Sequence, residues 1–584
     1  MGFIMDAIRF PSARSFAFAV AAVLPLVANG VGAGVRVAGA REPLRDASPA
    51  WYENDSADIP QPEERDPNLV WDGIDDSVSR PLSRFFNPVR AVRRVGSLFG
   101  GDNVPPATNV NALDEVPNSS WFENRIGIHG LSPAEAAQGP GDGDGPDHSA
   151  PWTVISAKTQ GVTPGFNIRD PLGDVYVIKF DLPDYDGHTI TVGVISSRIM
   201  YAAGYNTPDD AITTFRREEL RLGERVSIKL RDGSKRPMTE ADLDTILAHV
   251  AQAPDGSYRA IASKFLTGKP LGPFNYTGRR KDDPNDRINH EDRRELRGLR
   301  LFSSWLHNFD TKQHNSLDMF VEEDGRHFVK HHLIDFTGTL GAAGRGPVPR
   351  YGYEYTLDMP AIFSRIGSLG FDEDGWRRID RPEGLDEIGY YESKEYEPYE
   401  FDPLQHNTSF DNMTDRDGYW AAKIISAFTD EHLAAIVAEA HYRDPAASAY
   451  MAKTIAERRD KVVREAFDRV APLDFFRMDG DVVSFRDLGV ERVVYPEASI
   501  RYRVRCGAAN ADRDVARWCE WSESERNTTI DLSRAPASEV IADASIEQYP
   551  FVAIECEVDR GHGWSPTVTA YVARASRRVV AVDR

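Results

Sequence analysis

The stretch from Leu301 to Gly341 constrains the fold of this chain more than any other part of its sequence. It begins as the apolar end of a helix and continues as a polar loop. Two runs of strand-forming residues then flank the polar turn Glu322–Arg326, which predicts a β-hairpin, and a second polar loop follows. The sequence therefore predicts a helix, a loop, a hairpin and a loop in succession, with chemically reactive side chains in both loops.

Asp310, Lys312 and Asn315 stand in the first loop, and Asp335 begins the second. Carboxylate and amide oxygens suit a hard divalent cation, and an ammonium group neutralises phosphate charge. The set therefore predicts a site for phosphate and metal. Asp310 is the candidate catalytic carboxylate that meets an acceptor hydroxyl, and Lys312 is the candidate neutraliser of the transferring phosphate. Asn315 and Asp335 are the candidate ligands of Mg²⁺ (or Mn²⁺).

The spacing Asp310-x-Lys312-x-x-Asn315 resembles the catalytic loop of protein kinases, and Asp335-Phe336-Thr337 resembles their metal-binding Asp-Phe-Gly. The match has three departures. Thr337 replaces the glycine, Asn308 stands where the kinase loop has its histidine, and the hairpin makes the interval between the two motifs longer than in ordinary protein kinases. With these departures, the segment is similar to the atypical kinases of the HipA type or the spore-coat CotH type.

The resemblance extends over roughly residues 150–470 and implies a nucleotide site upstream of the catalytic loop. Strand patterns end in the apolar run before Lys179, and a glycine-containing turn precedes them. Gly161 and Gly165 would let the backbone approach the phosphates of ATP closely. The resemblance implies that Lys179 holds the α- and β-phosphates, whereas a lone lysine in an amphipathic strand is ordinarily just exposed.

Residues 189–203 form the next predicted helix, which corresponds to the kinase helix that carries a glutamate paired with the strand lysine. This helix contains no acidic residue; Glu218 and Glu219 come only after a further predicted strand. The departure supports an alternative function, a catalytically degenerate kinase fold used for binding or scaffolding. Nucleotidyl transfer on the same fold is a third possibility, and glycosidase-like use of the carboxylates has only the paired acids in its favour.

The remaining pattern up to residue 472 fits the same fold class. Residues 220–259 have the pattern of an insertion that contains a helix capped by Thr239 and Asp242. A central strand at 258–267 leads to a Gly-Pro hinge, and helical periodicity returns at 290–308 and 420–467. Between these helices, the aromatic and acidic stretch 389–401 either shapes an acceptor site or packs as a surface loop.

The first 150 residues predict export and an irregular extension. Arg9 and Arg14 precede an apolar run, and an Ala-x-Ala site follows at Ala38–Ala40, as in a secretory signal peptide. The apolar run is shorter than the roughly 20 residues that a membrane span requires, so a periplasmic or extracellular location is predicted, with an uncleaved anchor as the alternative. Residues 41–150 are rich in Pro, Asp, Asn and Gly and include two short amphipathic pieces within 77–98.

Residues beyond 472 change to short alternating strands, which predict an antiparallel β-sandwich that loosely resembles fibronectin-type modules. All three cysteines of the chain lie there: Cys506, Cys519 and Cys556. An odd number in an exported protein predicts one disulfide and one thiol, and three buried thiols are the equal alternative. This part carries no catalytic set, so its expected role is packing or binding a partner at the cell envelope.

These observations predict a multidomain α+β protein in which a two-lobed protein-kinase-like fold precedes a β-sandwich. The expected boundaries are 1–40 (signal or anchor), 41–150 (extension), 151–472 (kinase-like domain) and 473–584 (sandwich). The expected function is ATP- and Mg²⁺-dependent transfer to a hydroxyl acceptor that the sequence does not identify. The net charge of −22 argues against nucleic acid as a general partner, because binding to a phosphate backbone needs a basic face.

Overall fold

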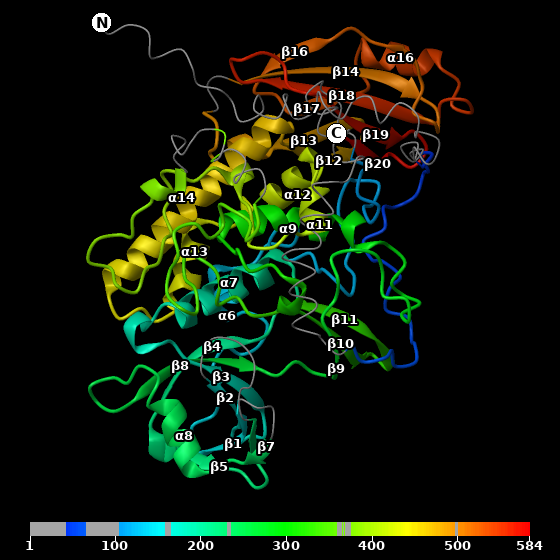
Figure 1. The fold of residues 1–584 in the computed structure, drawn as a ribbon. Coiled ribbons are helices and arrows are strands. Elements are labelled where there is room, and N and C mark those ends of the chain that lie inside the picture. Colours follow the sequence, from blue (N-terminus) through cyan, green and yellow to red (C-terminus); the bar gives the residue numbers. More distant parts are fainter. Residues whose placement is uncertain are drawn as a thin grey trace, which may run out of the picture.

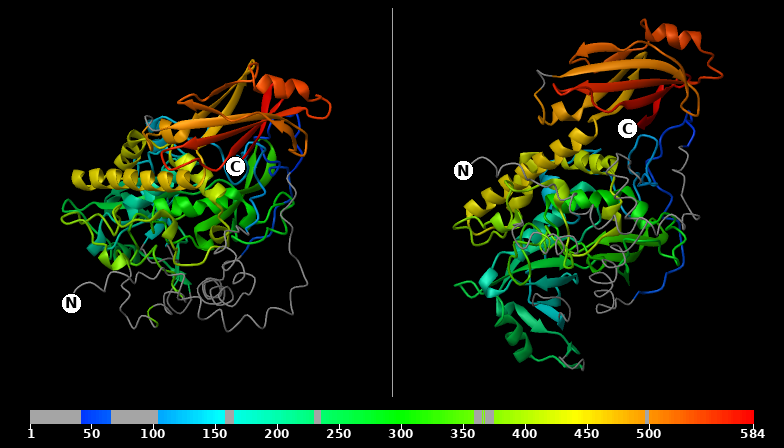
Figure 2. Two further views of the ribbon diagram at one scale, coloured as in Figure 1. Left: turned by 90° about the horizontal axis from the view of Figure 1, so that it is seen from above. Right: turned by 45° about the horizontal axis from the view of Figure 1, so that its top comes forward.

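The computed structural model describes residues 42–65, 104–157, 165–229, 235–358, 365, 367, 375–496 and 500–584. The signal segment, the amphipathic pieces within 77–98 and Gly161 lie outside these residues. The fold is a mixed α/β arrangement with several antiparallel sheets. A six-stranded sheet lies at one end, helices occupy the middle, and a second strand-rich unit lies at the other end (Figures 1 and 2).

The first sheet has the strand order β4-β8-β3-β2-β1-β5 and is antiparallel except where β5 joins β1. Buried and half-exposed residues alternate along Val175–Lys179, one of the inner strands. The β-branched residues of this segment suit such a half-buried strand. Its core contains Phe166, Ile168 and Ile178. The strands are β1 (Trp152–Ala157), β2 (Gly165–Arg169), β3 (Val175–Lys179), β4 (Asp210–Phe215), β5 (Leu220–Leu222) and β8 (Tyr258–Lys264).

Helix α7 (Thr189–Ala203) lies between this sheet and the other helices and has the limits that the sequence predicts (Figure 1). Asp181 caps its first turn, because its Oδ1 atom accepts a hydrogen bond from the Thr189 amide at 2.9 Å. Gly204 ends the helix at a φ of 127°, a conformation that favours glycine. Nearly every side chain of α7 is buried, so the helix is packed on both sides.

The predicted insertion consists of β6 (Ser227–Lys229), β7 (Lys235–Pro237) and α8 (Glu240–Leu247). The predicted cap of α8 is confirmed. The Thr239 side chain accepts from the Asp242 amide, and the Asp242 carboxylate accepts from the Thr239 amide at 2.8 Å. Leu243 and Leu247 of α8 bury against the sheet core, so the insertion extends that core.

The helical region has its own large core, to which segments from distant parts of the sequence contribute. Trp305 and Trp420 are fully buried in it. Val116, Trp121 and Phe122 of the extension are also buried there, so this part of the extension packs against the helices. The helices are α6 (Pro133–Gln138), α9 (Arg294–Trp305), α11 (Thr408–Asp411), α12 (Asp415–Ile425), α13 (Asp430–Ala438) and α14 (Pro445–Arg469).

The predicted hairpin is formed by β10 (Ser316–Glu323) and β11 (Arg326–Leu333), and β9 (Lys269–Gly272) pairs with β10 to complete a three-stranded sheet. Ser316 pairs with Leu333 at the end of the hairpin opposite its turn, so the loops that precede and follow the hairpin lie side by side. Residues 42–65 run along the molecule beside this sheet (Figure 1), where Ile59 and Arg65 donate backbone hydrogen bonds to His327 and Leu271.

The C-terminal unit contains a three-stranded sheet (β12-β13-β17) and a larger sheet in which β14 and β18 are central. Residues of both sheets share one core. The strands are β12 (Leu473–Asp479), β13 (Val482–Asp487), β14 (Arg501–Ala509), β15 (Val515–Trp518), β16 (Ser522–Glu525), β17 (Thr529–Asp531), β18 (Phe551–Asp559), β19 (Val568–Ala573) and β20 (Arg578–Asp583).

One predicted strand of this unit is wrong. The stretch Ser538–Asp543 belongs to a helix, α16 (Ala537–Asp543). Ala537 and Val540 are its buried residues and stand three positions apart, which is a helical spacing rather than the alternation of a strand. Among the described residues, no helix is both long and apolar enough to cross a membrane.

A network of buried charges joins the C-terminal unit to the helices. The guanidinium of Arg584 is 2% exposed, lies 2.8 Å from the Asp474 carboxylate, and also faces Asp114. Lys423 of α12 lies 3.1 Å from the same Asp474 carboxylate. Coulomb attraction from Arg584 and Lys423 outweighs burial and lowers the pKa of Asp474. The charges therefore remain ionised at neutral pH and hold the two units together.

We expect Arg584→Met to lower the free energy of unfolding by about 3 kcal/mol, because it leaves buried carboxylates without their partner. Arg517→Met is the matched control, since Arg517 is 66% exposed and lies 3.7 Å from Asp543. The control should change the free energy by less than about 1 kcal/mol. Urea unfolding followed by tryptophan fluorescence measures both variants, and equal losses would contradict the assignment of the network.

Candidate active site

The loop after α9 gathers three of the predicted residues into one cluster. The Lys312 ammonium lies 2.8 Å from the Asp310 carboxylate. The Asn315 amide nitrogen donates to the Asp310 carbonyl at 2.8 Å and to the Asp310 carboxylate at 3.1 Å. Asp310 is 27% exposed and Lys312 is 32% exposed, so the cluster is open to a ligand from one side.

Asp335 stands next to this cluster at the other end of the hairpin. The Ile334 amide donates to the Asn315 carbonyl at 3.0 Å, which ties the two loops together. Asp335 adopts a φ of 59°, an unusual conformation for a residue other than glycine, and its Oδ1 atom accepts from the Thr337 hydroxyl at 2.6 Å. Thr337, which replaces the expected glycine, therefore fixes the orientation of the Asp335 carboxylate.

Lys179 reaches this loop from the first sheet. Its ammonium lies 3.0 Å from Asp335 Oδ1, and it is only 14% exposed. The neighbouring residues Ile178 and Phe336 belong to the core of the sheet and the core of the helical region, respectively. The ion pair thus bridges two separately packed parts of the molecule, and residues 156 positions apart in the sequence meet in one site.

Gly165 lies at the edge of the same site. It is the first residue of β2 and stands opposite Lys179 in the antiparallel register. This position is compatible with the predicted approach of the backbone to a phosphate group. The structure therefore brings together Asp310, Lys312, Asn315, Asp335 and Lys179, with Gly165 beside them; Gly161 lies outside the described residues.

The structure adds Asp210, which sequence reasoning missed. Asp210 pairs with Ser263 across the β4–β8 ladder and accepts a hydrogen bond from the Ser263 hydroxyl. The ladders place Lys179 opposite Ile261, two residues from Ser263. Because side chains two residues apart in a strand point to the same face, Asp210 and Lys179 both face helix α7.

The charge state of Asp210 depends on its surroundings. Its side chain is fully buried, and burial raises the pKa of the carboxyl to about 6. A hydrogen bond from Ser263 and the charge of Lys179 both lower the pKa and oppose this shift. The carboxyl of Asp210 and the ammonium of Lys179 therefore lie close enough to interact.

The two glutamates considered from the sequence lie elsewhere. Glu219 accepts a hydrogen bond from the Arg216 amide at 2.5 Å and lies 3.6 Å from His148. Glu218 lies in the same short 3₁₀ turn. This turn follows the last residue of β4, whereas Asp210 is the first residue of that strand. The acidic group on the face of Lys179 is Asp210 of strand β4 instead.

Helix α7 approaches the site closely through small residues. A β-carbon added to Gly193 would lie 2.8 Å from Ile261 and 3.5 Å from Thr337. The Ser196 hydroxyl lies 2.8 Å from the Thr339 hydroxyl. At Gly193 the helix lies against the Asp335 loop and leaves little room for a larger residue. This close packing agrees with the absence of a long acidic side chain in α7.

Buried polar side chains lie inside the protein next to the segment that leads to Asp310. Burial lowers the pKa of His307 to about 3, so this histidine is neutral at physiological pH and its role is structural. Arg458 is fully buried, donates to the Ser304 carbonyl at 2.8 Å, and stacks on Tyr396 at 3.6 Å. Tyr391 and Tyr396 are themselves buried, so the aromatic side chains of segment 389–401 pack into the core.

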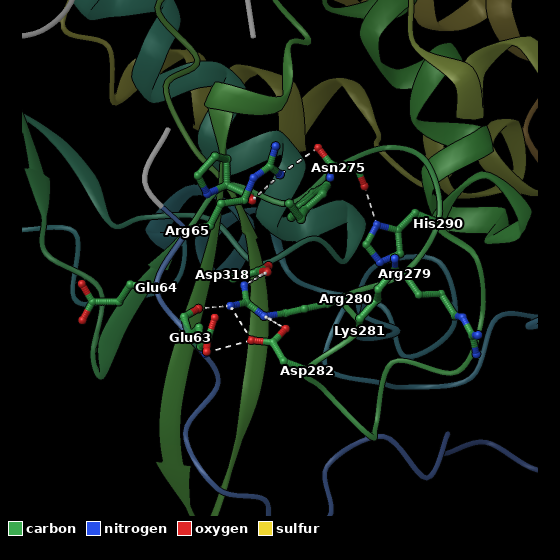
Figure 3. Close-up of a pocket in the computed structure, with 12 residues that line it drawn as sticks. Glu63, Glu64, Arg65, Asn275, Arg279, Arg280, Lys281, Asp282, His290 and Asp318 are labelled. Carbon is green, nitrogen blue, oxygen red and sulfur yellow. Dashed lines mark hydrogen bonds and ion pairs between the residues drawn. The ribbon is translucent and has the colours of Figure 1, made fainter. Parts of the chain in front are cut away.

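A separate polar cavity of about 410 Å³ lies beside β10 (Figure 3). Its charges are largely paired within the protein: Arg280 lies 3.0 Å from Asp318 and 3.2 Å from Asp282, and Arg65 donates to Asn275 at 2.7 Å. None of the predicted site residues lines this cavity. Asp318 is three residues beyond Asn315 in the chain, so the cavity and the candidate active site share strand β10.

The protein alone offers few ligands for a metal. In the described parts of the chain, no group of three or more His, Cys, Asp or Glu side chains is arranged to hold one. Asn315 uses both hydrogens of its amide nitrogen on Asp310, which leaves its oxygen as the atom able to coordinate a cation. Such a donor set fits Mg²⁺, which is usually bound by one or two protein oxygens together with phosphate and water.

No family model and no curated protein matches the chain. Solved structures that align with it include a golgi casein kinase at 10% identity, with a TM-score of 0.28 and coverage of 55% of this chain and 75% of that one. A hydra Fam20 structure with sugar aligns at 12% identity and a TM-score of 0.25, covering 55% and 86%. The Helicobacter pylori proinflammatory kinase CtkA aligns at 10% identity and 0.26, covering 54% and 98%. TM-scores below 0.5 do not establish a shared fold, so the inference below is drawn from the strand order and the site geometry.

The raised pKa of Asp210 predicts a pH-dependent stability. The folded protein keeps the proton up to about pH 6, whereas the unfolded chain loses it near pH 4. The free energy of unfolding of the wild type should therefore fall by about 2–3 kcal/mol relative to Asp210→Asn as the pH rises from 4 to 7. Urea unfolding at several pH values measures this difference.

Asp324→Asn is the control for this experiment, because Asp324 is 89% exposed and lies at the hairpin turn. Its stability relative to wild type should not change over the same pH range. A constant difference between wild type and Asp210→Asn would show that Asp210 is ionised throughout, and would contradict the interpretation of its burial.

Proposed function

We propose that the chain is an ATP- and Mg²⁺-dependent phosphotransferase with an atypical, two-lobed kinase-like domain at residues 151–472. The observation that carries the proposal is the Lys179–Asp335 ion pair of 3.0 Å, formed beside the Asp310, Lys312 and Asn315 cluster. A binding module has no need for all of these groups in one open site, whereas phosphoryl transfer uses each of them.

The order of the elements supports the proposal. The lysine strand β3 is followed by helix α7, then by strands β4 and β8, and finally by the loop of Asp310 and the hairpin. This is the order that the resemblance to kinases implies, with β5, β6, β7 and α8 as an insertion before β8. The proposed sandwich-like domain, 473–584, begins where β12 follows the long helix α14.

The proposed reaction uses the groups of the first loop. The acceptor hydroxyl gives its proton to the Asp310 carboxylate while its oxygen forms a bond to the terminal phosphorus of ATP, and ADP departs. The Lys312 ammonium, already 2.8 Å from Asp310, stabilises the negative charge on the phosphoryl oxygens. The amide of Asn315 holds the Asp310 side chain in place through two hydrogen bonds.

The nucleotide and the cation would occupy the space between Lys179, Asp335 and Asn315. Mg²⁺ (or Mn²⁺), when bound, would neutralise the negative charge of the phosphates. The Asp335 carboxylate and the Asn315 amide oxygen are the proposed protein ligands. Since Lys179 occupies Asp335 Oδ1 in this structure, ligand binding would redirect Lys179 toward the α- and β-phosphates, with the Asp210 carboxyl on its protein side.

A catalytically degenerate, nucleotide-binding scaffold is the second candidate function. The observation in its favour is that α7 contains no acidic residue, so the lysine lacks its usual helix partner. Nucleotidyl transfer would use the same residues and differ only in which phosphorus is attacked.

The proposed location is outside the cytoplasm, with an uncleaved membrane anchor as the alternative. The C-terminal domain is the proposed binding site for a partner at the cell envelope.

Thermal unfolding in the presence of ATP and Mg²⁺ tests the binding site. Ligand at 100 times its dissociation constant should stabilise the wild type by about 2.7 kcal/mol. The stabilisation should require the metal and should be lost in Asp335→Ala. Lys269→Met is the matched control, because Lys269 is 47% exposed and pairs with Glu64. A wild type that responds to no nucleotide or metal would contradict the proposal.

Transfer of label from ATP to acceptor hydroxyls, or to the protein itself, separates the candidate functions. A phosphotransferase labels the acceptor from the γ-phosphate of ATP, and a nucleotidyl transferase labels it from the α-phosphate. A scaffold leaves the acceptor unlabelled in both cases. We expect γ-label only, and a rate that is lowered about 10²–10⁴-fold by Asp310→Asn. The same variant should still be stabilised by ATP and Mg²⁺, because Asp310 is not a proposed metal ligand.

A further inference from the structure

Two of the three cysteines lie next to each other: Cys506 on strand β14, and Cys519 directly after the neighbouring strand β15. Gly507 of β14 pairs with Trp518 of β15, which places Cys506 opposite Cys519. The Cys519 amide donates to the Cys506 carbonyl at 2.8 Å, and the Cys506 amide donates to the Cys519 sulfur at 3.0 Å. Opposed residues in antiparallel strands have Cα atoms about 4.5–5.5 Å apart, which lies within the range of about 4.4–6.8 Å that a disulfide spans.

The third cysteine has a different position. Cys556 is fully buried on β18, on the other side of β14, and stands opposite Val504. Cys506 itself stands opposite Ile554 in that ladder, so Cys506 and Cys556 are diagonal neighbours. Diagonal neighbours in a sheet are about 7–8 Å apart, farther than opposed residues. The geometry therefore favours Cys519 over Cys556 as the partner of Cys506.

The surroundings of Cys519 favour its thiolate. A hydrogen bond from the Cys506 thiol lowers the pKa of Cys519 to about 6, and the neighbouring Arg505 guanidinium acts in the same direction. Arg505 is itself paired with Glu555 at 2.6 Å and stacks on Trp518 at 4.6 Å. Cys519 is only partly buried, whereas Cys506 and Cys556 are buried and have raised pKa values.

We propose that Cys506 and Cys519 are a redox modification site. A low-molecular-weight disulfide such as oxidised glutathione oxidises the two thiols, and a disulfide bond forms between Cys506 and Cys519. The Cys519 thiolate attacks one sulfur of the oxidant and releases one glutathione thiolate. The Cys506 thiol gives its proton to solvent, attacks the Cys519 sulfur and releases the second glutathione thiolate. The two protein thiols are oxidised to one disulfide, and the oxidant is reduced to two thiols.

The bond would fasten an exposed edge of the C-terminal unit. β15 and β16 pair only with β14 in the described part of this sheet, and their charged side chains are mostly exposed. Arg503 and Arg505 stack on Trp521 at 4.6 Å each and form the non-covalent part of this attachment. A disulfide across 13 sequence positions would restrict the opening of the edge. The inference is independent of the proposed catalytic function.

Peptide mapping of the purified full chain tests the proposal. The protein is treated with oxidised glutathione at pH 7, blocked with iodoacetamide and digested with trypsin. Cleavage at arginine places Cys506 in the peptide 506–513, Cys519 in 518–526 and Cys556 in 535–560. We expect 506–513 joined to 518–526, with a mass two hydrogen atoms below the sum of the free peptides, and Cys556 carrying the alkyl group.

Two variants complete the test. Cys556→Ser should retain the linked peptides, and Cys519→Ser should lose them and leave Cys506 alkylated after unfolding. Without oxidant, brief exposure of the wild type to iodoacetamide should label Cys519 before Cys506 and Cys556. Alkylation of all three cysteines after glutathione treatment, or a link between 506–513 and 535–560, would overturn the proposal; both outcomes are read on wild-type protein and need no folded variant.

Discussion

The ion pair between Lys179 and Asp335 is the interaction on which the arrangement of the candidate site depends. Its partners stand beside residues of two separately packed cores. Strand β3 fixes Lys179, and the Thr337 hydroxyl together with a left-handed backbone fixes Asp335. A lysine and a carboxylate that are both partly shielded from water attract each other more than a fully exposed pair does, and this pair links the sheet to the loop after the hairpin.

The same ion pair gives the site its chemical character. Without ligand, the Lys179 ammonium and the Asp335 carboxylate neutralise each other. A metal-bound nucleotide would separate them, because the cation would attract the carboxylate and the phosphates would attract the ammonium. Asp210 would keep a negative charge on the protein side of Lys179 after that exchange when its carboxyl is ionised. Its pKa of about 6 means that this charge is present at neutral pH and is lost in mildly acidic solution.

Local patterns predicted much of the structure. The limits of α7, the cap of α8 and the hairpin follow from periodicity, capping residues and turn residues, which act over a few positions. The grouping of Asp310, Asn315 and Asp335 was also predictable, because one hairpin joins their loops. The meeting of Lys179 with Asp335 was expected only through the resemblance to kinases, since no local rule joins residues so far apart.

What the sequence did not predict depends on packing between distant segments. No local pattern distinguishes Asp210, and only the β4–β8–β3 ladders show that it shares a face with Lys179. Helix α9 looked amphipathic, yet Arg294 on its polar side is also buried, because Asp114 and Asp417 arrive from other parts of the chain to neutralise it. The few apolar residues of helix α16 fit either periodicity, so the sequence predicts a strand where the structure has a helix.

The measurement that tests the central claim most directly is electron paramagnetic resonance of Mn²⁺ added to the protein with a non-hydrolysable ATP analogue. If Asp335 and Asn315 hold a metal between the phosphates, the signal of free Mn²⁺ should fall further when protein is added to Mn²⁺ and the nucleotide than it does with the nucleotide alone. It should not fall with protein alone, because the protein supplies too few ligands. Wild-type protein that binds no more Mn²⁺ with the nucleotide than without it, or Asp335→Asn protein that binds as much as wild type, would contradict the assignment of this site.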